Sequence, residues 1–153
     1  MEIRRFEKGD LGEVKRVIDQ TIEVSYREVY PPEAIDFFKE YHSEEHILDD
    51  AEKGYSIVVL IEGRIVGTGT LLETNIRRVF VYPSAQRRGI GKRIMEDLED
   101  RARMMGVKTV DLASSLVSKE FYDSLNYVCE EQTFIPLEND EKLVYYEMRK
   151  RIA

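Results

Sequence analysis

The sequence predicts a mixed α/β domain of the α+β kind, in which segments typical of strands and of helices alternate. Three observations lead to this class. Three apolar runs typical of strands follow one another directly between residues 55 and 82. Glu62-Gly63-Arg64 joins the first two of them as a tight turn, which is typical of an antiparallel hairpin. Elsewhere apolar residues recur at helical spacing.

The N-terminal half is expected to contain a strand, two helices and three further strands. Glu2 to Phe6 is read as the first strand. Asp10-Leu11-Gly12-Glu13 has the acid-x-x-Glu form of a helix start, and this helix is expected to run to about Tyr30. Pro31-Pro32 ends it, and a second helix carries the chain through Tyr41. The strands then cover residues 55–61, 65–72 and 75–82. Glycines 67 and 69 inside the second of these strands indicate a bend or a close approach of another group.

The C-terminal half continues the alternation of helices and strands. A helix from residue 90 ends near Gly106, because glycine is common just past a last helical turn. A strand at 107–113, a short helix at 118–125 and strands at 127–134 and 143–148 follow. The predicted order is β-α-α-β-β-β-α-β-α-β-β. No repeat or linker interrupts it, so we expect one domain over residues 1–153.

Composition narrows the class of protein further. The chain is 42% hydrophobic and 35% charged, and no apolar run approaches the length of a membrane helix. The charged first ten residues lack the apolar segment of a signal peptide, and the single cysteine, Cys129, excludes an internal disulfide. We therefore expect a cytoplasmic protein with Cys129 in its core. A net charge of −7 argues against nucleic-acid binding.

The stretch from Val79 to Lys92 has the features of an anion site. A buried strand ends at Pro83, a glycine-containing basic turn follows, and a helix begins near Ile90. The free N–H groups and the dipole of a helix N-terminus favour anions. Residues 76–93 hold six basic residues and no acidic one. The spacing excludes a Walker A loop and a G-x-G-x-x-G dinucleotide loop. The alternative is a turn with surface arginines and no ligand.

The segment Gln86-Arg87-Arg88-Gly89-Ile90-Gly91 resembles the Q/R-x-x-G-x-G/A pyrophosphate loop of the GNAT superfamily, the Gcn5-related N-acetyltransferases. The order of elements agrees with that family along nearly the whole chain. The resemblance implies the GNAT fold, a mostly antiparallel sheet of six to seven strands with helices on both faces, whose strands 4 and 5 splay apart. It also implies acetyl-CoA as cosubstrate, with its diphosphate at this loop and its pantetheine along the backbone of Phe80 and Val81.

A second segment, Ser114 to Tyr127, resembles the family pattern N-x-x-A-x-x-F-Y-x-x-x-G-F. Phe121-Tyr122 matches, whereas Ser115 stands for the usual Asn and Ser118 for the usual Ala. The resemblance implies that Tyr122 protonates the departing CoA thiolate; the alternative is that Tyr122 only packs. The cofactor-binding residues that the resemblance implies are Phe80, Val81, Gln86, Arg87, Arg88, Gly89, Ile90, Gly91, Lys92, Ser115 and Ser118.

The function that the resemblance implies is direct transfer of an acetyl group from acetyl-CoA to a primary amine of a small molecule or peptide, without an acyl-enzyme. The alternative is a non-catalytic CoA-binding module, and pairing of two copies is left open. The general base also stays open, because Asn75 stands where some members have Glu. The alternatives are Glu73, Glu23, His42 and His46. His42 and His46 lack a third metal ligand, so no metal site is expected.

The acceptor side is expected to be aromatic and acidic. Aromatic residues surround Pro31-Pro32, and the acidic segment 138–141 lies between the last two strands, which overhang the acceptor cleft in the family. Such an entrance suits a cationic amine. The alternative is a core cluster and a solvated acidic turn. The aromatic residues are Tyr26, Tyr30, Phe37, Phe38 and Tyr41.

Overall fold

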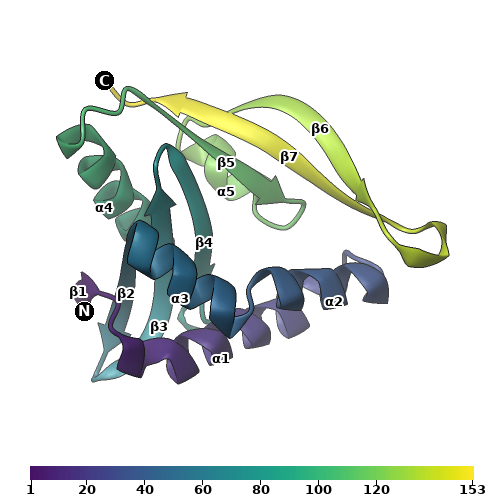
Figure 1. Ribbon diagram of the computed structural model, residues 1–153, viewed down its shortest axis with the longest axis horizontal. Helices are drawn as coiled ribbons and strands as arrows, with labels where there is room; N and C mark the ends of the chain where they lie inside the picture. The colour runs from purple at the N-terminus through teal and green to yellow at the C-terminus, as the bar shows by residue number, and fades with distance from the viewer.

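The computed structural model describes residues 1–153 and contains a seven-stranded mixed sheet in the order β1-β2-β3-β4-β5-β7-β6 (Figure 1). The strands are β1 Glu2–Arg5, β2 Tyr55–Ile61, β3 Arg64–Leu72, β4 Asn75–Val81, β5 Thr109–Ser115, β6 Val128–Pro136 and β7 Lys142–Arg151. The helices are α1 Leu11–Thr21, α2 Pro32–Tyr41, α3 Glu44–Lys53, α4 Ile90–Met104 and α5 Lys119–Ser124. None of these helices is both long and apolar enough to cross a membrane.

All the predicted strands are present, but the first helix ends earlier than predicted and one helix was not predicted. The first helix does not continue to Tyr30. Its α-helical part ends at Thr21, and a wider turn over Ile22–Tyr26 follows, in which the Arg27 N–H donates to the Ile22 carbonyl, 3.2 Å away and five residues earlier. In addition, α3 was not predicted. It forms because the Ser43 hydroxyl accepts a hydrogen bond from the His46 N–H at its N-terminus.

Apolar side chains of the sheet alternate between two cores. Along β2, Ile57 and Val59 pack into the core beneath α4, while Val58 between them packs into the core beneath α1 and α2. The sheet is therefore covered by helices on both faces, as a buried sheet requires.

Strands β4 and β5 run parallel and are paired at one position, Asn75 opposite Asp111. The carboxylate of Asp111 accepts hydrogen bonds from the Asn75 amide and the Thr74 hydroxyl, each at 2.8 Å. The other neighbouring strands pair antiparallel over several residues. The two central strands therefore separate beyond Asn75, which is the splay that the sequence predicted.

Strand β3 contains the close approach that its glycines predicted. A Cβ atom on Gly69 would lie 2.5 Å from Cγ2 of Ile94 and 3.1 Å from Cδ1 of Leu98, both on α4.

We expect Gly69→Ala to lower the free energy of unfolding by about 1–3 kcal/mol through overpacking. Gly12→Ala on α1 is the control, because its Cβ would meet nothing within 4 Å. It should stabilise the protein by up to about 1 kcal/mol. Urea denaturation measures both, and equal effects would contradict the packing of α4 on β3.

Candidate active site

A cleft of about 520 Å³ opens where β4 and β5 part. One wall is the C-terminal half of β4, from Val79 to Val81, and the floor is the turn into α4. The opposite wall comes from the start of α5, and Thr21, Ser25 and Tyr26 contribute from the end of α1 and the turn after it. Sequence elements that are far apart thus meet at one elongated site.

The turn into α4 presents free backbone donors to this cleft. The six consecutive N–H groups of residues 87–92 make no hydrogen bond within the protein. Arg87 and Gly89 both have left-handed backbone conformations, with φ of 62° and 79°. The chain therefore turns sharply just before α4 begins at Ile90. Free N–H groups at a helix N-terminus form an anion site. The structure therefore supports the anion-binding interpretation of this turn.

Gly91 is required by close packing. A Cβ atom at this position would lie 3.0 Å from Cζ of Phe121 on α5. Its absence lets the first turn of α4 approach α5, which carries Tyr122. The turn and the tyrosine are thereby held in one cleft.

Side chains provide hydrogen-bond donors to a backbone carbonyl at the edge of β4 inside the cleft. The carbonyl of Val81 accepts a hydrogen bond from the Gln86 amide at 3.0 Å. The Thr21 hydroxyl also lies 3.2 Å from it, although the nearer acceptor for its single proton is the Val17 carbonyl at 2.7 Å. A backbone group in a cleft needs such partners. These contacts show a strand carbonyl that is able to accept from an amide, which is what the binding of a pantetheine arm requires.

A second cavity of about 340 Å³ joins the first. It is bounded by α2, the start of β4, and strands β5 and β7. Because five residues line both spaces, the two meet at those residues, and a ligand in one can contact a ligand in the other. The shared residues are Tyr26, Val79, Phe80, Ser118 and Tyr122.

Tyr122 lies at this junction on α5. Tyr122 is only 7% exposed to solvent, and its ring packs edge-on against Phe121 and Tyr127. Burial raises the pKa of Tyr122 above that of an ordinary phenol. The phenol therefore stays protonated at neutral pH and has a proton available to donate.

A small hydroxyl cluster lies beside it. The Ser115 hydroxyl donates to that of Ser118 at 3.3 Å, and Tyr26 lies next to both. Burial raises the pKa of Tyr26, and the neighbouring Ser115 and Ser118 hydroxyls offset part of the increase. Ser115 lines the second cavity, not the cleft over the turn.

Most of the residues predicted for the cofactor come together in the first cleft. Arg88 does not line the cleft, and its side chain is exposed. The sequence analysis missed Thr21 and Ser25, which also line the cleft. A single polar residue in an amphipathic helix is common, so neither position stood out. The predicted residues that line the cleft are Phe80, Val81, Gln86, Arg87, Gly89, Ile90, Gly91, Lys92, Ser118 and Tyr122.

Three of the four candidate bases lie outside both cavities. Glu23 is paired with Arg27 and Lys39 at the surface, and its hydrogen bonds to them lower its pKa to about 2. Glu73 and His46 are exposed and line neither cavity. The described residues contain no group of three or more His, Cys, Asp and Glu side chains arranged to hold a metal ion.

His42 does line the second cavity, but its ring is placed to donate a hydrogen bond and not to accept a proton. Its Nδ1 lies 3.3 Å from Nε of Arg78, which can only donate, so Nδ1 accepts and Nε2 carries the proton. Burial, and then the nearby Arg78, lower the pKa of His42 well below its ordinary value. The imidazole is therefore neutral, and in this tautomer it does not take up the amine proton.

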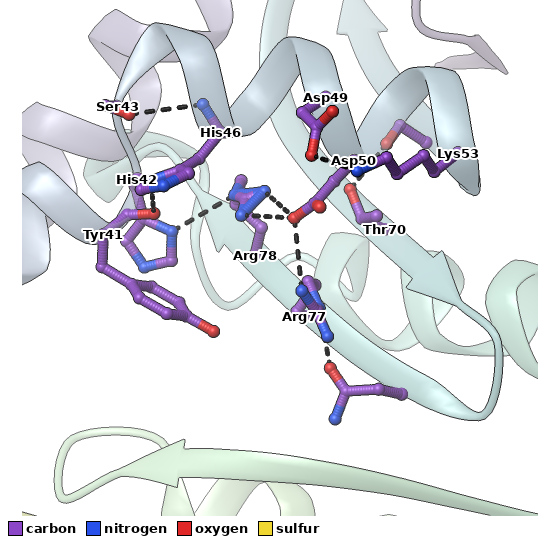
Figure 2. A network of polar contacts seen from close by, with 12 residues as sticks. Tyr41, His42, Ser43, His46, Asp49, Asp50, Lys53, Thr70, Arg77 and Arg78 are labelled. Carbon is purple, nitrogen blue, oxygen red and sulfur yellow. Dashed lines mark hydrogen bonds and ion pairs between the residues drawn. The ribbon is translucent and has the colours of Figure 1, made fainter.

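Two consecutive arginines of β4 converge on one carboxylate (Figure 2). Nη1 and Nη2 of Arg78 lie 3.0 and 2.8 Å from Oδ2 of Asp50 on α3, and Nη1 of Arg77 lies 3.3 Å from the same atom. Nε of Arg77 donates to the Asn75 side-chain oxygen at 2.8 Å. Sequence reasoning missed this cluster because it had not predicted the helix that carries Asp50.

The lining of the second cavity is aromatic but holds no acidic side chain. Tyr26, Phe37, Phe38 and Tyr41 line the second cavity as expected. Tyr30 does not; its hydroxyl donates to the Val144 carbonyl and accepts from the Leu116 N–H. No acidic side chain lines this cavity, and the predicted acidic segment 138–141 forms an exposed turn. The acidic segment is therefore not part of the lining of this cavity, and an acidic entrance to it stays a prediction.

Comparisons with known proteins agree with this geometry. The acetyltransferase (GNAT) domain family matches residues 26–152. A Gcn5-related N-acetyltransferase of Rhodopseudomonas palustris superposes with a TM-score of 0.89 at 20% identity, over 98% of this chain and 94% of that one. The PaiA N-acetyltransferase of Thermoplasma acidophilum, solved with coenzyme A, gives 0.73 at 16% identity over 98% of each chain. YncA of Salmonella typhimurium, solved with acetyl-CoA, gives 0.69 at 16% identity over 100% of this chain and 94% of that one.

The family match covers most of the chain, and the fold is shared along nearly all of it. The chain belongs to the GNAT acetyltransferase family.

Proposed function

We propose that this protein transfers the acetyl group of acetyl-CoA directly to a primary amine of a small molecule or peptide, with residues 1–153 acting as one catalytic domain. The observation that carries the proposal is the meeting of two cavities at Tyr122. One cavity ends at a turn of six free N–H groups, and the other is open to a second ligand. A donor thioester and an acceptor amine could therefore meet beside a buried phenol.

The first cleft fits the cofactor in charge and shape. The N–H groups of residues 87–92 would bind the diphosphate, with charge from the Arg87 and Lys92 side chains that line the cleft. Arg88, exposed beside the cleft, would contribute only at longer range. The backbone of Phe80 and Val81 would pair with the pantetheine arm, in which case the Gln86 amide gives up its bond to the Val81 carbonyl. Ser118, with Ser115 behind it, would contact the thiol end of the arm.

The proposed chemistry needs one proton donor from the protein. The amine nitrogen attacks the thioester carbonyl carbon, and the carbon–sulfur bond breaks as the new carbon–nitrogen bond is completed. The departing thiolate accepts the proton of the Tyr122 hydroxyl, and the nitrogen loses a proton to water. That proton returns to the phenolate through water. The thiol pKa of about 8.5 lies below that of the phenol, so a strong hydrogen bond at the transition state would also be effective.

A non-catalytic CoA-binding module is the alternative. The observation in its favour is that Asn75 and the donor His42, not a carboxylate, line the second cavity. Release of free thiol from acetyl-CoA in the presence of a panel of amines separates the two functions. Acetyl-CoA binding without amine-dependent thiol release would establish the module.

The turn can be tested by Gly89→Glu. The substitution places a negative side chain at the proposed anion site, so the dissociation constant for acetyl-CoA should rise by at least about 100-fold. Gly63→Glu is a matched control. Its φ of 78° equals that of Gly89 within a degree, and a Cβ at either site meets nothing within 4 Å. It lies in the β2–β3 turn, so it carries the same backbone strain without the charge in the cleft. Titration calorimetry measures both, and equal losses would contradict the proposed site.

Tyr122→Phe tests the proton donor. It removes only the hydroxyl, so kcat should fall by about 100-fold while the affinity for acetyl-CoA hardly changes. The decrease should be smaller with an acetyl thioester whose thiol is more acidic, because a better leaving group needs less protonation. Stopped-flow or steady-state thiol assays measure these values. Wild-type kcat in the variant would assign Tyr122 to packing alone.

A further inference from the structure

We propose that the second cavity binds an amine that also carries a carboxylate, and that Arg77 binds this carboxylate. The inference rests on the proposed function, because it names the class of acceptor for the same site. It replaces the cationic acceptor that the sequence predicted. Four features of the cavity support it: its charge, the placement of its arginines, their free donors and its length.

The lining of the second cavity has an excess of positive charge. Arg77 and Arg78 line it together with the neutral His42, and no Asp or Glu does. Asp50 lies behind the two arginines and is shared by both, so one positive charge is left without a counter-ion in this cluster. The chain as a whole has a net charge of −7. A local reversal of sign at a cavity favours an anionic ligand.

A β-bulge places both arginines on one side of the sheet. Thr70 pairs with Arg77 and Thr68 pairs with Phe80, so one residue of β3 lies opposite two residues of β4. Arg78 takes the left-handed backbone conformation, with φ of 57°. In a regular strand consecutive side chains point to opposite faces. The bulge instead directs Arg77 and Arg78 toward Asp50 and the second cavity, as Figure 2 shows for the side chains.

The two arginines differ in their free donors. Arg78, whose side chain is 3% exposed, uses Nε for His42 and both Nη atoms for Asp50. Arg77, whose side chain is 27% exposed, uses one N–H for Asn75 and one for Asp50. A guanidinium has five N–H donors, which leaves Arg77 with three. Arg78 therefore fixes the position of Asp50, while Arg77 keeps the N–H groups of Nη2 and one of Nη1 to donate to a carboxylate. The Nε2 proton of His42 is a further donor in the same cavity.

The length of the cavity sets the spacing within the acceptor. Arg77 is three residues from Phe80, where the two cavities meet, and three residues of strand span at most roughly 10 Å, less here because the bulge lies between them. An amine at the junction and a carboxylate at Arg77 are therefore best separated by several bonds. The aromatic side chains of Phe37, Phe38 and Tyr145 line the cavity. They suit an apolar or aromatic spacer.

The test compares amines that differ only in the carboxylate. The first pair is 4-(aminomethyl)benzoate and 4-(aminomethyl)benzamide, and the second is L-phenylalanine and L-phenylalaninamide. We expect kcat/KM for the acid to exceed that for its amide by about 10-fold or more, as a charge-assisted contact provides, with the larger ratio in the first pair. Equal values, or better turnover of the amides or of spermidine, would overturn the inference and leave the N-acetyltransferase function intact.

Variants of Arg77 locate the contact. Arg77→Met keeps an unbranched apolar stem and removes the charge, so the acid-to-amide ratio should fall toward 1. Arg77→Lys keeps the charge and should retain a preference for the acid. Affinity for acetyl-CoA should be the same in both variants, which controls for folding. An unchanged ratio in Arg77→Met would overturn the assignment to Arg77.

Binding separates this inference from the proposed function. Calorimetry with the CoA-loaded protein compares N-acetylated 4-(aminomethyl)benzoate with the corresponding amide, and needs no turnover. Tighter binding of the acid that depends on Arg77, without acetylation of any amine, would support the carboxylate site and refute the enzyme. Absence of both binding and turnover would refute both.

Discussion

The separation of β4 from β5 is the feature on which the rest of this structure depends. Two parallel central strands would normally continue their ladder, and here they pair only at Asn75 and Asp111. The Asp111 carboxylate binds Thr74 and Asn75 at this point, which ties the two strands together where they begin to part. Beyond it the backbone of β4 faces a cleft and not a neighbouring strand. The turn into α4, Ser118 and Tyr122 then all border one space, because each follows the end of β4 or β5 in the chain.

The second constraint is the β-bulge of β4. One additional residue turns Arg78 into the left-handed conformation and aligns it with Arg77 on the side of α3. Burying the Arg78 guanidinium requires a partner, which Asp50 supplies, and this pair fixes α3 against the sheet. The same contacts orient His42, because its Nδ1 accepts from Arg78. The charge and the donor pattern of the second cavity thus arise from the local geometry of one strand.

The sequence predicted the sheet and the strand–turn–helix form of residues 79–92 well, because both depend on local patterns. Apolar runs bounded by glycine and proline marked the strands, and the spacing of Gln86, Gly89 and Gly91 marked the turn. Helix α3 was missed because few of its residues are apolar, although Ser43 before two glutamates and Gly54 at the end were usable boundary signals. The arginine cluster could not be predicted, since it depends on a bulge and on a pairing between residues 50 and 78. The position of the acidic segment 138–141 likewise depends on the β6–β7 hairpin, in which Ile135 and Leu143 line the cavity and the acidic turn between them does not.

The central claim is that the gap between β4 and β5 holds the acetyl-CoA arm and brings its thioester to Tyr122. A crystal structure of the protein with acetyl-CoA tests it most directly. The account predicts the diphosphate on the N–H groups of residues 87–92, the arm beside Phe80 and Val81, the Gln86 amide released from the Val81 carbonyl, and the sulfur within hydrogen-bond distance of the Tyr122 hydroxyl. A cofactor bound outside this gap, or a sulfur remote from Tyr122, would contradict it.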